Sequence, residues 1–104
     1  MRTYKTKMEK LIPYYREAGF VTRAYILLVT DVGCEQEVCK TIKTIPEVRD
    51  AYTLHGAYDL LIDIEADDLN YLKEVIQKRI RSMEKVRSTL TMIERVNKAE
   101  LGKP

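Results

Sequence analysis

The sequence predicts an α+β fold of the ferredoxin-like type, with four antiparallel strands and two helices in the order βαββαβ. Short apolar runs typical of strands alternate with segments in which apolar residues recur at helical spacing. Two of the strand runs are separated by one short break, which favours an antiparallel hairpin. The chain has 104 residues, is 45% hydrophobic and 33% charged, and therefore matches a single soluble domain.

The first strand is expected over residues 24–30, AYILLVT, an apolar run that ends at Asp31 and Gly33. Its lack of clean alternation is typical of a central strand that is covered on both faces. The first helix is expected from about residue 33 to residue 44, because Pro46 prevents its continuation. The apolar positions that recur at helical spacing are Val38, Ile42 and Ile45.

The next two strands form the predicted hairpin, over residues 48–55 and 58–66, with a break at Gly56-Ala57. The third strand alternates with a period of two, so that one of its faces is apolar and the other is mostly polar. The first face carries Tyr58, Leu60, Ile62 and Ile64, and the second carries Asp59, Leu61, Asp63 and Glu65.

A second helix is expected to begin at the cap Asp67-Asp68 and to run to about Met83. Its predicted inner stripe is Leu69, Leu72, Ile76, Ile80 and Met83. The last strand is expected over residues 87–96, with Leu90, Met92 and Val96 on one face. Residues 97–104 are polar and are expected to form a loose tail.

One face of this sheet would be left without a cover. Right-handed crossovers place both helices on the same face of a four-stranded sheet. We expect Leu61 and Ile93 to point to the other face, among polar neighbours such as Asp63 and Thr91. The sequence therefore predicts a dimer in which two sheets pair in a barrel-like arrangement.

The N-terminal segment is more basic than the rest of the chain. Residues 1–23 contain six Lys or Arg and two Glu, a net charge of +4, which leaves 12 basic and 14 acidic residues elsewhere. Residues 3–18 have helical spacing but include Pro13, so residues 1–22 are expected to form a short helical extension. Such a segment allows contact with nucleic acid without requiring it.

The composition excludes several classes of protein. Cys34 and Cys39 with a single histidine do not make a zinc site, and Cys39 is expected to be buried and Cys34 partly exposed. No apolar run reaches the ~18 residues that a membrane span needs. The sequence contains no GxGxxG motif and no phosphate-binding loop, so no metal and no cofactor is expected. Reduced cysteines and no secretory signal predict a cytoplasmic protein.

Several short motifs resemble the C-terminal effector-binding (RAM) domain of the Lrp/AsnC regulators, the leucine-responsive and asparagine-type family. They are IPEV at 45–48, GAYDLL at 56–61, the acidic cap and leucine at 67–69, and VRSTLT at 86–91. The resemblance covers residues 23–96. Family regulators carry a DNA-reading helix-turn-helix before this domain. In this sequence about 22 residues precede the domain, which are too few to form a helix-turn-helix. The resemblance thus implies a stand-alone effector domain.

The resemblance also implies that small effectors, chiefly amino acids, bind at the hairpin between neighbouring dimers. The effector-binding candidates are His55, Gly56, Tyr58, Asp59, Leu60, Ser88, Thr89 and Thr91. Asp59 would pair with an α-amino group, while backbone N–H groups and the hydroxyls would receive an α-carboxylate. Gly56 would permit a tight turn and His55 would lie over the ligand side chain.

The expected function is amino-acid sensing and oligomerisation, in dimers that assemble into tetramers or octamers. Such a domain would modulate transcription of amino-acid metabolism through assembly with full-length regulators, without sequence-specific DNA binding of its own. Simpler roles exist for each candidate: Gly56 as a turn residue, Asp59 as a hairpin cap, His55 as an exposed strand end, and the hydroxyls as ordinary strand composition.

Two other classes of function remain open at this point. Ser88 and His55 lack the third group of a catalytic triad, but small ferredoxin-like dimers include cofactor-free monooxygenases. That class predicts a closed apolar cavity inside each subunit, whereas a regulator predicts a polar site between dimers. A nucleic-acid binder would use the basic N-terminal segment, in which Tyr4, Tyr14 and Tyr15 accompany the basic residues.

Overall fold

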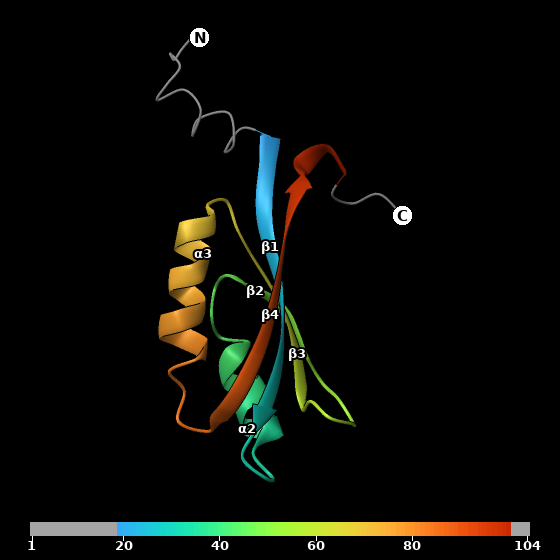
Figure 1. The fold of residues 1–104 in the computed structure, drawn as a ribbon, viewed down its shortest axis with the longest axis vertical. Coiled ribbons are helices and arrows are strands. Elements are labelled where there is room, and N and C mark those ends of the chain that lie inside the picture. The colour runs from blue at the N-terminus through green and yellow to red at the C-terminus, as the bar shows by residue number, and fades with distance from the viewer. Residues whose placement is uncertain (1–18, 101–104) are drawn as a thin grey trace.

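A computed structural model describes residues 19–100 and shows a four-stranded antiparallel sheet with its helices on one side (Figure 1). The strands are β1 (Phe20–Thr30), β2 (Val48–Thr53), β3 (Leu60–Ala66) and β4 (Val86–Asn97). The helices are α2 (Glu35–Ile42) and α3 (Leu69–Val75), which continues as a π-helical segment (Ile76–Ile80), and a short 3-10 turn (Lys98–Glu100) ends the described part. The strand order β2-β3-β1-β4 confirms the predicted ferredoxin-like βαββαβ fold. The predicted N-terminal helical extension lies outside the described residues, apart from its last few positions.

Strand β1 is the central strand, and it is longer than predicted. It starts at Phe20 rather than at residue 24, because β4 extends to Asn97 and provides pairing partners along the whole of β1. Its other edge pairs with β3. With both edges paired, its inward-facing side chains Ala24, Ile26 and Leu28 are fully buried.

The core lies between the sheet and the two helices. The predicted alternation of β3 is confirmed at Leu60, Ile62 and Ile64, which are fully buried. The predicted stripe of the second helix is confirmed at its buried members Leu72, Ile76 and Ile80, and Met83 packs against the core.

Leu69 was wrongly assigned to that stripe, because its side chain is 39% exposed. It is the first residue of α3 and lines a cleft together with the start of β1 and the C-terminal half of β4. The predicted helix cap is confirmed at Asp68, the residue immediately before Leu69. The Asp68 carboxylate accepts a hydrogen bond of 2.9 Å from the Tyr71 N–H and so satisfies a free donor of the first turn.

The strand register corrects the prediction for the uncovered sheet face. Directly paired residues in an antiparallel sheet share a face. Leu27 pairs with Leu61 and with Leu90, which places Leu61 on the uncovered face as predicted. Ile93, however, pairs with the buried Ala24 and therefore faces the helix side. Apolar residues occupy consecutive positions at Met92 and Ile93, so alternation alone could not decide which one faces outward.

Thr91 was also assigned to the wrong face, because it pairs with Ile26 on the helix side. Apolar residues on the uncovered face include Leu27, Leu61, Leu90 and Met92. Beside this apolar patch lies a charged network. Arg23 and Arg49 both contact Asp63 and Glu65, the shortest contact being 2.9 Å between Arg49 Nη1 and Glu65 Oε1.

Both cysteines are free thiols, Cys39 buried and Cys34 half-buried, as predicted. Of the helices within residues 19–100, none combines the length and the apolar character that crossing a membrane requires.

Candidate functional site

The hairpin between β2 and β3 ends in a longer loop than predicted. The strands stop at Thr53 and resume at Leu60, so Tyr58 and Asp59 belong to the loop and not to β3. The Leu54 N–H donates to the Asp59 carbonyl at 2.8 Å and closes the loop at its base. Gly56 has a φ of 150°, a backbone conformation that favours glycine. The positive φ of the hairpin loop at this position therefore explains why the residue is glycine.

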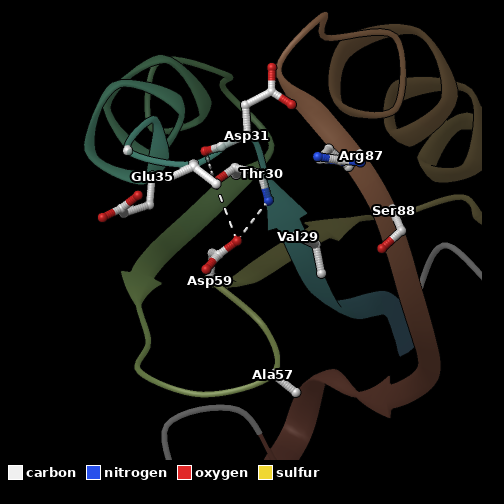
Figure 2. Close-up of a pocket in the computed structure, with 10 residues that line it drawn as sticks. Val29, Thr30, Asp31, Glu35, Ala57, Asp59, Arg87 and Ser88 are labelled. Carbon is white, nitrogen blue, oxygen red and sulfur yellow. Dashed lines mark hydrogen bonds between the residues drawn. The ribbon is translucent and has the colours of Figure 1, made fainter.

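Asp59 ties this loop to the end of β1. Its Oδ2 accepts a hydrogen bond from the Thr30 N–H at 2.8 Å and lies 3.4 Å from the Thr30 hydroxyl (Figure 2). Its own N–H donates to the Leu28 carbonyl at 2.7 Å. The register between β1 and β4 shifts between Val29 and Thr30. The carboxylate thus satisfies a backbone donor at the point where regular strand pairing is interrupted.

A cleft of about 720 Å³ opens beside Asp59. Its walls come from the end of β1, the loop before α2, the hairpin loop and the start of β4 (Figure 2). The lining residues are Val29, Thr30, Asp31, Val32, Gly33, Glu35, Ala57, Asp59, Arg87 and Ser88. Four segments that are distant in the sequence therefore form one open depression whose lining is both polar and apolar.

The charged groups of the cleft are arranged around it rather than paired. Figure 2 shows Glu35 and Asp59 on one side and Arg87 with Ser88 on the other, with Asp31 at the end of β1 between them. Within residues 19–100, the side chains of Asp31, Glu35 and Arg87 make no hydrogen bond or ion pair. The cleft thus presents three carboxylates and one guanidinium to solvent.

The predicted site residues are only partly brought together. Asp59 and Ser88 line the cleft, whereas Tyr58 is half-buried next to Asp59 and does not line it. His55 and Gly56 are exposed at the hairpin tip, outside the cleft. Leu60 is fully buried in the core.

The predicted set of hydroxyls is divided between the two faces of the sheet. Ser88 pairs with Val29 and shares the uncovered face with Leu90, whereas Thr89 pairs with Leu28 and, like Thr91, faces the helices. These three hydroxyls therefore do not converge on one ligand carboxylate within a single subunit.

Sequence reasoning missed Asp31, Glu35 and Arg87 as members of the cleft. Arg87 is the second residue of the VRSTLT motif, which was available as a signal because it adjoins Ser88. Asp31 and Glu35 were visible only as strand-end and helix-start residues. Their approach to Asp59 depends on the tertiary fold.

This open, charged cleft differs from the closed apolar cavity that a monooxygenase-type enzyme would need. His55 does not line it, so the cleft holds no Ser88–His55 pair. In the described part of the chain, no three His, Cys, Asp or Glu side chains are grouped so as to hold a metal ion.

Comparison with known proteins places this fold among regulatory domains. Residues 23–94 match the family model described as the Lrp/AsnC ligand binding domain. The crystal structure of a protein called FFRP-DM1 is 41% identical with a TM-score of 0.68, and the match covers 70% of this chain and 97% of that one. The crystal structure of a hypothetical protein from Pyrococcus horikoshii is 36% identical with a TM-score of 0.70, covering 80% and 99% of the two chains.

Two relatives are much longer than the matched segment. An uncharacterised HTH-type transcriptional regulator of Pyrococcus horikoshii is 28% identical over 84 residues, covering 78% of this chain and 56% of the regulator. A homocitrate synthase of Sulfurisphaera tokodaii is 39% identical over 67 residues, covering 60% of this chain and 14% of the enzyme. The chain therefore spans little more than half of the regulator and a small part of the enzyme.

Proposed function

Starting from the fact that the chain belongs to the Lrp/AsnC ligand-binding domain family, we propose that it senses an amino acid in the cleft beside Asp59 and couples this to assembly. The observation that carries the proposal is the placement of a carboxylate and a guanidinium on opposite sides of one cleft (Figure 2). A free amino acid carries both an ammonium and a carboxylate, and each must exchange its hydration for a partner on binding. The cleft provides both kinds of partner.

In this proposal Asp59 receives the ligand ammonium. Its Oδ2 is held by Thr30, which fixes the orientation of the carboxylate and leaves Oδ1 for the ligand. A group that is held in place before binding loses little entropy when the ligand arrives. The two roles of Asp59, hairpin anchor and ammonium acceptor, are therefore compatible.

Arg87 and Ser88 receive the ligand carboxylate. A guanidinium binds a carboxylate through two parallel N–H···O hydrogen bonds, which gives both strength and orientation. The Ser88 hydroxyl adds a third donor from the adjacent residue of β4. Of the predicted hydroxyls, Thr89 and Thr91 are then left without a role in the same subunit. Gly56 and Tyr58 act by shaping the loop, Leu60 packs in the core at the start of β3, and His55 is available to a neighbouring subunit.

We further propose that two copies pair through the uncovered sheet face. Leu27, Leu61, Leu90 and Met92 form an apolar patch there, and the charged network beside it contains residues of both signs. A surface with both signs of charge can be complementary to a second copy of itself. The result is a dimer with the helices outside.

Dimers would then join at the cleft, to give tetramers or octamers. Val32 lies on the cleft and its side chain is 97% exposed, so a neighbouring dimer would cover an apolar group as well as the ligand. An effector held between dimers shifts the equilibrium between separate and joined dimers, to the extent that its affinity for the two differs.

The biological role that we propose is modulation of transcription through mixed assembly with full-length Lrp/AsnC regulators, in the cytoplasm. No sequence-specific DNA binding by this chain is proposed. We also propose that the chain is not an enzyme, because the part it shares with homocitrate synthase is only 14% of that protein.

A thermal-shift screen over the common amino acids tests this function. A ligand that binds only the folded state stabilises it by RT ln(1 + [L]/Kd), so at least one amino acid should raise the melting temperature. Asp59→Asn and Arg87→Gln should each abolish that increase. Arg79→Gln, which removes an exposed arginine outside the cleft, is the matched control and should respond like the wild type. If no amino acid has an effect at millimolar concentration, the function is not amino-acid sensing.

A further inference from the structure

The helix side of β4 is only partly covered by α3. Because the strand order is β2-β3-β1-β4, β4 is an edge strand of the sheet. Ile93 faces the helix side and is 43% exposed, and Leu69, which lines the same cleft from the start of α3, is 39% exposed. Two large apolar side chains from different elements are thus incompletely buried at one place.

These side chains belong to a groove, which we call the α3–β4 groove. It consists of two adjoining clefts, of about 410 and 540 Å³, that share Asn70 and Ile93. Thr22 lies in the first cleft and is only 4% exposed, and its side chain makes no hydrogen bond within residues 19–100. A buried hydroxyl without a partner can bond to the backbone of a docked segment. The lining of the groove includes Phe20, Leu69, Asn70, Ile76, Thr91 and Ile93.

We propose that the α3–β4 groove binds the N-terminal segment of its own chain, residues 1–18, which lies outside the described residues. The described part begins at Gly19, and the next residue, Phe20, already lines the groove. Leu11 precedes Phe20 by nine residues, which span at most about 30 Å, so the segment is long enough to follow the groove. The proposal is independent of the amino-acid cleft, which adjoins the opposite end of β1.

The apolar part of the segment matches the apolar part of the groove. Residues 11–15 read LIPYY, an uninterrupted run without charge in an otherwise basic segment. A run of this kind gains free energy when it leaves water for an apolar surface, and Leu69 and Ile93 provide one. The segment that is attached to the groove thus carries side chains suited to covering it.

The charges of the segment and of the groove are opposite in sign. Residues 1–18 contain five Lys or Arg and two Glu, a net charge of +3. The charged residues that line the groove near Phe20 are Asp67, Asp68, Glu94 and Arg95, a net charge of −2. The Arg95 guanidinium lies 4.4 Å from the centroid of the Phe20 ring, and Lys98 approaches Asp67 only to 3.9 Å. Electrostatic complementarity therefore favours docking of the basic segment at this end.

Photo-cross-linking of the full chain tests the proposal. A photoreactive p-benzoylphenylalanine placed at Leu11 reacts with side chains that it contacts. We expect a cross-link to residues 69–77 or to residues 91–95, located by mass spectrometry after proteolysis. The product should have the mass of a monomer in denaturing gel electrophoresis, because the segment docks on its own subunit.

Two adjacent residues of β4 provide matched variants. Ile93→Lys removes an apolar contact and repels the basic segment, so it should abolish the cross-link. Met92→Lys is the control, because Met92 is almost equally exposed, at 44%, but lies on the opposite face of the sheet, and it should retain the cross-link. Ile12→Asp changes the segment and leaves residues 19–100 intact, and it should abolish the cross-link without affecting the fold.

Several results would overturn the proposal. A cross-linked product with the mass of a dimer would mean that the segment docks on a second copy. Cross-links that lie only outside the groove, or no cross-link at all, would leave the groove to the C-terminal tail or to another chain. Persistence of the cross-link in Ile93→Lys or in Ile12→Asp, or its loss in Met92→Lys, would show that Ile93 and the apolar run do not hold the segment.

Discussion

Leu60 is a residue of the family motif whose side chain lies in the core. It lies in the GAYDLL motif and was predicted to contact the effector, and its side chain is fully buried in the core between the sheet and the helices. Replacing a buried leucine by alanine removes apolar contacts and leaves a cavity, so we expect Leu60→Ala to lower the free energy of unfolding by about 2–5 kcal/mol. Urea denaturation measures this change. A loss below about 1 kcal/mol would show that the site collapses or that Leu60 is not in the core.

The hydrogen bond from the Thr30 N–H to the Asp59 carboxylate allows the structural role of Asp59 to be tested separately from its proposed role in ligand binding. Asparagine keeps an oxygen that can accept from the Thr30 N–H, whereas alanine leaves that donor unsatisfied. We therefore expect Asp59→Ala to lose about 1–3 kcal/mol of stability and Asp59→Asn much less. Both variants should lose amino-acid binding, because neither carries the charge that the ligand ammonium needs.

Denaturant unfolding with and without the amino acid distinguishes these effects. Equal destabilisation by the two substitutions would mean that charge, and not the acceptor oxygen, holds the hairpin loop to β1. Retained binding in Asp59→Asn would remove Asp59 from the proposed site.

At the scale of the elements, local patterns predicted the fold well. Alternation placed Leu60, Ile62 and Ile64 in the core, and the pair Asp67-Asp68 marked the start of α3. These signals depend on neighbouring residues only. The loop of the hairpin was predicted too short because Asp59 is held out of β3 by Thr30, a contact across 29 positions that no local pattern contains.

The last strand provides a direct test of which sheet face pairs. Met92 and Ile93 are adjacent and almost equally exposed, at 44% and 43%, but they lie on opposite faces. If two copies pair through the uncovered face, Met92→Asp should convert the dimer to a monomer, because it buries an unpaired charge in the interface. Ile93→Asp is the matched control and should remain dimeric.

Size-exclusion chromatography with light scattering measures both masses. A wild-type chain that is already monomeric at micromolar concentration would contradict the dimer. A dimer that Ile93→Asp disrupts and Met92→Asp preserves would place the interface on the helix side instead.

The candidate site was harder to predict than the fold, for a physical reason. Asp31, Asp59 and Arg87 come from three separate segments and meet only when β1 and its neighbours are in register. Ser88, Thr89 and Thr91 are equivalent candidates in the sequence, but strand pleating sends Ser88 to the other face. The family resemblance therefore predicted the hairpin as the region of the candidate site, and the tertiary fold determines which residues line the cleft.

At the scale of the whole molecule, assembly beyond the dimer should depend on the mouth of the cleft. Val32 is 97% exposed on the loop before α2, and we expect Val32→Asp to stop dimers from joining while leaving each dimer intact. Leu69→Asp is the control, since Leu69 is also exposed and begins α3, whose first turn lies at the opposite end of the sheet from α2 (Figure 1). Sedimentation velocity distinguishes the species. Unchanged tetramers or octamers in Val32→Asp would exclude this contact.

The most direct test of the account is a crystal structure grown with the amino acid that gives the largest thermal shift. We predict density for one amino acid in the cleft, with its ammonium at hydrogen-bond distance, about 2.7–3.2 Å, from Asp59 Oδ1 and its carboxylate on Arg87. A second dimer should cover the ligand from the Val32 side. An empty cleft with the amino acid bound elsewhere, or a ligand whose carboxylate avoids Arg87, would contradict the proposed site.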